Sequence, residues 1–130
     1  MVVAAILERD GRMLIGQRRP GGSHALKWEF PGGKVEPGES LETAIVRELR
    51  EELAIEAGDV REIHRYEYVY PGKRPLLLVF MRIESFTGEP ANHAFARIAW
   101  EKPSQFSRYD FLDGDQEFLI WLASGSPQTA

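Results

Sequence analysis

The chain is 130 residues long, with 43% hydrophobic and 11% aromatic residues and a formal net charge of -4. These values fit one domain over residues 1–130 and exclude a disordered chain. The lack of cysteine excludes disulfides and thiolate metal sites, and the negative charge argues against a nucleic-acid polymer as partner. No apolar run approaches the length of a membrane span. The apolar segment at residues 1–7 has no basic n-region and is too short for a signal peptide, so we expect a cytoplasmic protein with no membrane partner.

Six extended segments are predicted by apolar and β-branched runs that lie between turn residues such as Asp10-Gly11. In chain order they are residues 2–7, 13–18, 28–30, 60–70, 76–83 and 96–100. The run at 76–83 is almost continuously apolar, which is typical of a central strand buried on both faces. Residues 124–130 are expected to form a frayed tail.

Two helices are predicted, one after the third extended segment and one near the C-terminus. The first follows Ser40, a suitable N-cap, and carries an apolar stripe that recurs every four residues from Leu41 to Leu53. The second is expected to begin behind Asp113 or Asp115. The order of strands, helix, strands, helix predicts an α/β (α+β) fold, a mixed sheet with a helix on each side.

The first predicted helix carries three glutamates on one face. Glu48, Glu51 and Glu52 are spaced i, i+3 and i+4, so their side chains are neighbours. Their repulsion costs about 0.2–0.5 kcal/mol per close pair on an exposed helix, and a divalent cation would turn it into attraction. Carboxylate oxygens suit Mg²⁺ or Mn²⁺. Taken alone, such a segment is more often a solvated amphipathic helix, so the flanking residues must decide whether these glutamates bind a metal.

The flanking residues extend the pattern. Gly32-Gly33 lets the backbone approach a metal or phosphate closely, and Lys34 follows. Over residues 33–55 the spacing resembles the Nudix box, G-x5-E-x7-R-E-U-x-E-E-x-G-U, in which U is a bulky aliphatic residue. Ala54 differs from the box, which has glycine at this position, and we expect this difference to affect the turn after the helix more than the chemistry. The matching residues are Gly33, Glu39, Arg47, Glu48, Leu49, Glu51, Glu52 and Ile55.

The stretch WEFPGGKVEPGES, residues 28–40, also resembles the MutT branch of the Nudix family. The resemblance implies an α/β/α sandwich around a central mixed sheet. It also implies hydrolysis of a nucleotide diphosphate linkage by water, with Mg²⁺ or Mn²⁺. Glu52 would be the principal metal ligand, and Glu48, Glu51 and the Gly32 carbonyl would complete the set. Glu39 would pair with Arg47, the remaining catalytic residue of the box, and hold the loop against the helix.

The resemblance also implies a set of substrate-binding residues. Arg18 and Lys34 would contact phosphate or base, and Phe30 would line the base pocket together with two strand residues. Asp115 falls where the branch places an Asn or Asp that reads the base. An ionised Asp only accepts hydrogen bonds, which weakens the case for 8-oxo-dGTP and leaves a base with a cytosine-type amino group, or a broad base preference, as alternatives. The two strand residues are Tyr70 and Leu77. The aromatic residues also fit plain core packing, and Asp115 also fits a helix N-cap.

The general base is left open. MutT-like enzymes often carry a glutamate in the loop that corresponds to residues 91–95, and this chain has none there. His93 is therefore a candidate base, because its ordinary pKa lies near 6.5, although a histidine in a surface loop is more often idle. Otherwise Glu48 or Glu51 serves.

Three functions follow for comparison. The first is a (deoxy)nucleoside triphosphate pyrophosphohydrolase, with 8-oxo-dGTP or a related purine tested first. The second is a hydrolase of ADP-ribose or another nucleoside diphosphate derivative. The third is a nucleotide sensor without activity, which the complete set of box glutamates disfavours. A small-molecule nucleotide is the expected partner, and the chain is expected as a monomer or a homodimer.

Overall fold

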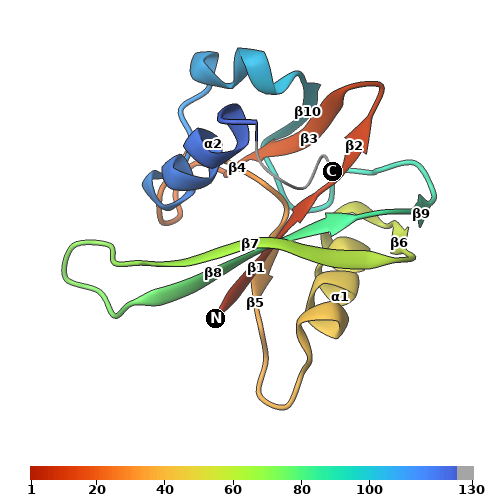
Figure 1. Cartoon of the computed structure of the whole chain (residues 1–130), viewed down its shortest axis with the longest axis horizontal. Helices are drawn as coiled ribbons and strands as arrows, with labels where there is room; N and C mark the ends of the chain where they lie inside the picture. The colour runs from red at the N-terminus through yellow and green to blue at the C-terminus, as the bar shows by residue number, and fades with distance from the viewer. Residues whose placement is uncertain (126–130) are drawn as a thin grey trace.

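In the computed structural model, which describes residues 1–125, a four-stranded mixed sheet lies at the centre of the molecule (Figure 1). Strand β8 (Leu76–Ile83) lies between β1 (Val2–Ile6) and β7 (Val60–Tyr68), so the central position predicted for it is confirmed. β1 and β8 are parallel, whereas β7 and β5 (Gly32–Lys34) join the sheet antiparallel. This register brings the Gly32-Gly33 turn beside β1.

A second, antiparallel sheet packs against the first. It consists of β10 (Arg97–Glu101), β3 (Arg12–Gln17) and β2 (Glu8–Arg9), and β4 (Trp28–Glu29) pairs with β3. A small separate pair joins β6 (Glu56–Ala57) to β9 (Phe86–Thr87). The division of the strands among several sheets was not predicted, and neither were the short strands β2, β5, β6 and β9.

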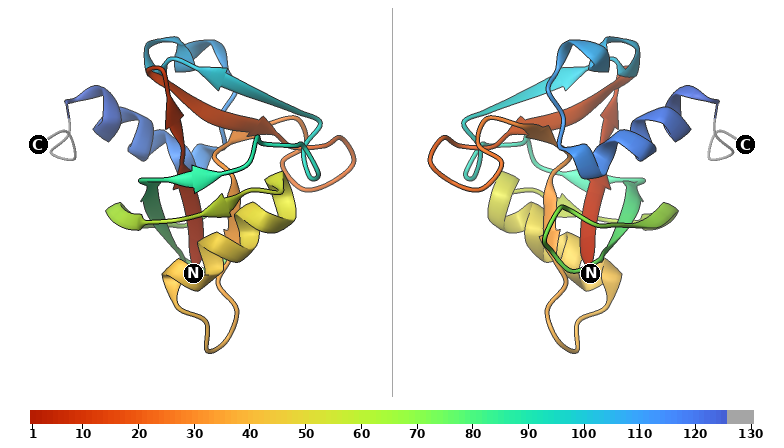
Figure 2. Two further views of the ribbon diagram at one scale, coloured as in Figure 1. Left: turned by 90° about the vertical axis from the view of Figure 1, so that its right-hand side faces the viewer. Right: turned by 90° about the vertical axis from the view of Figure 1, so that its left-hand side faces the viewer.

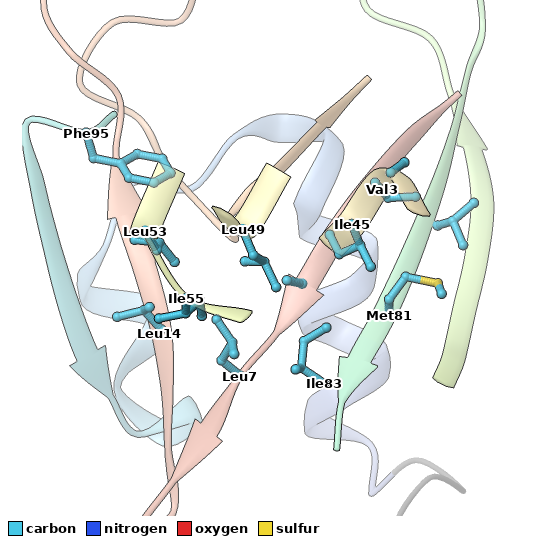
Figure 3. Close-up of a cluster of buried hydrophobic side chains, with 13 residues drawn as sticks. Val3, Leu7, Leu14, Ile45, Leu49, Leu53, Ile55, Met81, Ile83 and Phe95 are labelled. Atoms are coloured by element: carbon cyan, nitrogen blue, oxygen red, sulfur yellow. The ribbon is translucent and has the colours of Figure 1, made fainter. Parts of the chain in front are cut away.

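Helix α1 (Leu41–Leu53) covers one face of the central sheet, and its apolar stripe is buried (Figure 3). The Ser40 side chain accepts a hydrogen bond from the Thr43 N–H, which confirms the predicted N-cap. Helix α2 (Gln116–Ala123) lies on the other side of the sheet, beyond a second, aromatic-rich cluster (Figure 2). Two short 3-10 helices, η1 (Pro103–Arg108) and η2 (Asp113–Asp115), precede it and were not predicted.

The predicted architecture of a mixed sheet with a helix on each side is therefore confirmed. The helix cap expected from Asp115 is not, because its side chain makes no capping hydrogen bond at the start of α2. Residues 126–130 of the predicted tail lie outside the described residues. None of the helices formed within residues 1–125 has the length and apolar character needed to cross a membrane.

Candidate active site

The glutamates of α1 lie directly against the Gly32-Gly33 turn. The Gly32 N–H donates a hydrogen bond to Glu52 Oε1 at 3.0 Å. A Cβ atom on Gly33 would lie 2.1 Å from Glu48 Oε2, and one on Gly32 would lie 2.0 Å from the Val3 carbonyl. Gly32 also has a φ of 152°, which disfavours any side chain. Gly32 is therefore required by the close approach of the β1 backbone, whereas a side chain on Gly33 would displace the Glu48 carboxylate.

Arg47 ties the loop before α1 to the helix. Its guanidinium donates to both oxygens of Glu39, at 2.7 and 3.0 Å, and to the Lys34 carbonyl at 3.1 Å. It also donates to Glu51 at 3.1 Å and to Glu48 at 3.4 Å. The pairing expected between Glu39 and Arg47 is thus present. The hydrogen bond to Arg47 lowers the pKa of Glu39, and the same bond raises the pKa of Arg47.

One cavity, of about 540 Å³, is lined both by Glu52 at the glycine turn and by Asp115 at the start of α2. Leu76, Leu78 and Phe80 form an apolar wall on β8. Of the residues predicted to bind substrate, the cavity is lined by Arg18, Phe30, Lys34, Tyr70 and Asp115. A cavity that combines an apolar wall with a few polar groups is the usual form of a small-molecule site.

Leu77 does not line this cavity, which corrects the prediction for this residue. It packs against the cluster beneath α1, on the opposite face of β8. Successive side chains of a strand point to opposite faces, so Leu76 and Leu78 take the place assigned to it. Phe30 satisfies both interpretations given for it, since it lines the cavity and is also buried among Phe111 and Phe118.

Glu29 lies at the centre of the site and was not predicted. It lines the large cavity and also a neighbouring one of about 400 Å³, as do Arg18 and Glu52. Arg18 Nη1 donates to both Glu29 oxygens, at 3.1 and 3.2 Å, and Arg18 Nε donates to the Ser23 carbonyl at 3.0 Å. Burial raises the pKa of Glu29, and Arg18 opposes that shift. Lys73 and Arg74, beyond β7, also line the large cavity and were not predicted.

Comparison with known proteins agrees with this geometry. A family model described as the NUDIX domain matches residues 1–122. The chain belongs to the NUDIX domain family. The CTP pyrophosphohydrolase of Escherichia coli (strain K12) is 41% identical, over 91% of this chain and 87% of that protein. The 8-oxo-dGTP diphosphatase of the same organism is 38% identical, over 68% of this chain and 69% of that protein.

Solved structures give the same family. The E. coli ORF135 protein matches with a TM-score of 0.83 and 38% identity, over 97% of this chain and 91% of that chain. A MutT structure from work on Aliivibrio salmonicida and Vibrio cholerae matches with a TM-score of 0.81 and 28% identity, over 95% and 96% of the two chains. The protein is therefore a Nudix hydrolase with a MutT-like fold, as the resemblance implied.

Two glutamates of this Nudix hydrolase, Glu48 and Glu52, lie where burial and neighbouring carboxylates disfavour the charged form. Burial raises the pKa of Glu52 to about 8, and the nearby carboxylates of Glu48, Glu29 and Glu51 raise it further, against the Gly32 hydrogen bond. Burial is also the main cause of the raised pKa of Glu48. A bound cation would offset both the repulsion among the carboxylates and the free-energy cost of burying them in their charged form. Their oxygen atoms are the donors that a hard divalent ion prefers.

The same glutamates are engaged with protein partners in this structure. Within residues 1–125, no group of three or more acidic or histidine side chains is arranged to hold a metal ion. Glu52 accepts from Gly32, and Glu51, whose side chain is 59% exposed, accepts from Arg47. The donor set of carboxylate oxygens fits a divalent cation in its chemistry. A role for the Gly32 carbonyl stays a prediction.

The environment of Asp115 disfavours the ionised form that was expected for it. Its side chain is buried, and burial raises its pKa to about 8, with a further rise from Glu29 and an opposing effect of Arg18. This shift favours the protonated carboxyl at neutral pH. A protonated carboxyl donates one hydrogen bond and accepts others, as an amide does.

His93 lies at the edge of the site. Its backbone N–H donates to the Glu52 carbonyl at 2.9 Å, which holds the 91–95 loop against the end of α1. Its side chain is exposed. The role of general base stays a prediction for His93, as it does for Glu48 and Glu51.

Proposed function

We propose that this Nudix hydrolase is a nucleoside triphosphate pyrophosphohydrolase, and that cytidine triphosphate is its first candidate substrate. The observation that carries the proposal is the single cavity that is lined by Glu52 and the glycine turn and also by Asp115. A nucleotide needs such a site, with acidic residues for metal at the phosphates and a buried polar group at the base. The 41% identical relative, a CTP pyrophosphohydrolase, matches along nearly the whole chain.

Each part of the cavity has a task in this proposal. Lys34, Lys73 and Arg74 bring positive charge to the phosphates, and the β8 wall with Phe30 excludes water from the base. Water forms a bond to a phosphorus of the diphosphate linkage, the P–O bond to the leaving group breaks, and a proton passes from water to Glu48, Glu51 or His93.

Metal binding is part of the proposal. Glu52, Glu48, Glu51 and the Gly32 carbonyl would hold Mg²⁺ or Mn²⁺, which supplies charge neutralisation of the phosphate and a lowered pKa of water. Arg47 keeps β5, which carries Lys34, and the loop after it against the helix that carries the glutamates. The glycine turn brings the two segments into contact.

The base is assigned through Asp115. A neutral carboxyl offers an acceptor and a donor side by side, which matches the N4 amino group and N3 of cytosine. 8-oxo-dGTP is the second candidate, because its N7–H and O6 present a similar donor and acceptor pair. A relative that is 38% identical, an 8-oxo-dGTP diphosphatase, supports this candidate.

The test is hydrolysis of a nucleotide panel with Mg²⁺, with the products separated by chromatography. The panel holds CTP, 8-oxo-dGTP, the normal deoxynucleoside triphosphates, ADP-ribose and a dinucleoside polyphosphate. Release of CMP and pyrophosphate from CTP supports the proposal. A preference for 8-oxo-dGTP would keep the proposed triphosphate substrate class and change only the assigned base. Cleavage of ADP-ribose alone would overturn the substrate class. Tight binding without turnover would favour a sensor.

The glutamate assignment has its own test. Glu52→Gln replaces the carboxyl of the most buried metal candidate with an amide that cannot ionise to bind the cation, so we expect hydrolysis to fall by orders of magnitude while the fold is retained. Glu42→Gln, on an exposed position of the same helix, is the matched control and should keep its activity. Near-normal activity of Glu52→Gln, measured at saturating Mg²⁺, would remove the metal-site assignment.

A further inference from the structure

The start of α2 lacks the capping bond that its sequence offers. Asp115 occupies the N-cap position, and Asp is among the strongest N-cap residues. An N-cap side chain normally accepts a hydrogen bond from the N–H two or three residues further on. Here the Asp115 side chain makes no such bond and lines the cavity instead. Another group must therefore satisfy the first turn of α2.

That group is the hydroxyl of Tyr66, from β7. The Phe118 N–H, three residues after Asp115, donates to Tyr66 Oη at 3.1 Å. The Tyr66 hydroxyl in turn donates to the Gly114 carbonyl at 2.6 Å. The Gly114 N–H donates to Tyr70 Oη at 2.9 Å. The hydroxyl of Tyr66 on β7 and that of Tyr70 in the segment after β7 thus hold residue 114 on both sides, and the Tyr66 hydroxyl replaces the missing cap.

The fit around Gly114 is tight. A Cβ atom there would lie 2.7 Å from Tyr70 Oη. Tyr66 is itself fixed by stacking on Phe80, with ring centroids 5.6 Å apart. Both tyrosines are partly buried, and burial raises the pKa of each, so the hydroxyls stay protonated and able to donate. The turn before α2 is therefore positioned by Tyr66 on β7 and by Tyr70, two residues beyond the end of that strand.

We propose that Tyr66 is a positioning residue for base selectivity: its hydroxyl caps α2 in place of Asp115 and so keeps the Asp115 carboxyl in the cavity. The inference rests on the proposed function, in which Asp115 reads the base. Without the Tyr66 hydroxyl, the Phe118 N–H and the Gly114 carbonyl lose their partner. The carboxyl of Asp115, already at the N-cap position, would then turn to the helix.

The experiment is Tyr66→Phe, which keeps the ring and removes the hydroxyl. We expect KM for the preferred triphosphate to rise about tenfold and its preference over other bases to fall, with kcat changed less than about twofold, since the glutamates are untouched. Tyr68→Phe is the matched control on the same strand. Its hydroxyl makes no hydrogen bond within residues 1–125, so its selectivity should be that of the unmodified protein. Unchanged selectivity in Tyr66→Phe would overturn the proposal.

A double-mutant cycle with Asp115→Ala separates positioning from a general loss of stability. If Tyr66 acts through Asp115, adding Tyr66→Phe to Asp115→Ala should change selectivity no further. Additive losses of selectivity would contradict the proposal. If Asp115→Ala alone leaves selectivity unchanged, the base-reading role fails as well, and with it the positioning role.

A spectroscopic readout makes the two failures distinguishable, because it needs no substrate. The ¹³C shift of the Asp115 carboxyl, followed against pH, reports where the group lies. In Tyr66→Phe the carboxyl should accept backbone N–H bonds and titrate at lower pH than in the unmodified protein or in Tyr68→Phe. Glu29 and Arg18, which face the same carboxyl, are unaltered in all three proteins. An unchanged titration would overturn the inference even if the substrate proposal holds.

Discussion

Folding raises the pKa of Asp115, so its carboxyl is a weaker acid in the folded protein than in the unfolded chain. Its pKa is about 8 in the folded protein, against 3.8 for an unperturbed Asp. Between these values the folded state holds one more proton than the unfolded state. Stability therefore falls as pH rises through this window, by up to about 1.4 kcal/mol per pH unit. Above pH 8 both states are ionised and the slope from this group vanishes.

Asp115→Asn should remove that slope, because an amide does not titrate in this range. We predict that the variant gains free energy of unfolding over the unmodified protein steadily from pH 5 to pH 8. Urea unfolding at several pH values measures the difference directly and cancels the contributions of the other carboxyls. A constant difference across the window would show that Asp115 is ionised in the folded protein.

Ala54, the one departure from the Nudix box, adopts the conformation for which the box has glycine. Its φ of 55° and ψ of 35° are left-handed, and its N–H donates to the Arg50 carbonyl at the end of α1. Ala54→Gly should stabilise the protein by about 0.5–1 kcal/mol, since only glycine adopts this conformation without strain. Thermal unfolding measures the gain. Ala123→Gly, at a right-handed helical position, is the control and should not stabilise.

Residues were predictable where spacing alone specifies chemistry. The glutamates of the Nudix box and the pairing of Glu39 with Arg47 follow from fixed intervals in one segment. Glu29 could not be found in this way, because it meets Arg18 only when β3 and β4 pair. Leu77 was misplaced because an apolar run such as 76–83 has no alternation from which to tell its two faces.

At the scale of elements, the start and the apolar face of α1 were predicted because its cap and its stripe are both encoded locally. Strands of two or three residues, such as β6 and β9, contain no full period, so only their partners define them. The two 3-10 helices likewise carry no repeating apolar pattern. The sequence therefore predicts the scaffold better than the connections that bring residues to the cavity.

Arg47 joins two elements, the loop after β5 and helix α1, through five hydrogen-bond acceptors. Arg47→Lys keeps the charge and loses the planar fork that reaches both Glu39 oxygens. We expect a lower melting temperature and a rate of hydrolysis about 10–100-fold lower, the usual cost of losing a group that orients ligands. Arg50→Lys, in an exposed pair with Glu56, is the control. Equal effects of the two changes on melting temperature and hydrolysis rate would mean that Arg47 belongs to an ordinary surface ion pair.

At the scale of the whole molecule, the central sheet separates two cores. Alternate residues of β1 and β8 face either the cluster beneath α1 or the aromatic cluster beside α2. The large cavity is lined by residues from both sides of the central sheet, because Glu52 comes from α1 and Asp115 comes from the start of α2. Which strands pair across the chain depends on long-range packing, and no local pattern predicts it.

The two cores should respond to mutation independently. Ile45→Val on the buried face of α1 should cost about 0.5–1.5 kcal/mol, and Phe118→Leu on the buried face of α2 roughly 1–2 kcal/mol. The residues share no cluster, so the costs in the double variant should add within about 0.5 kcal/mol when measured by urea unfolding. Phe80→Leu with Phe118→Leu is the contrasting pair, because these rings stack at 4.0 Å and should not add. Strong coupling between Ile45 and Phe118 would show that the sheet transmits packing changes from one core to the other.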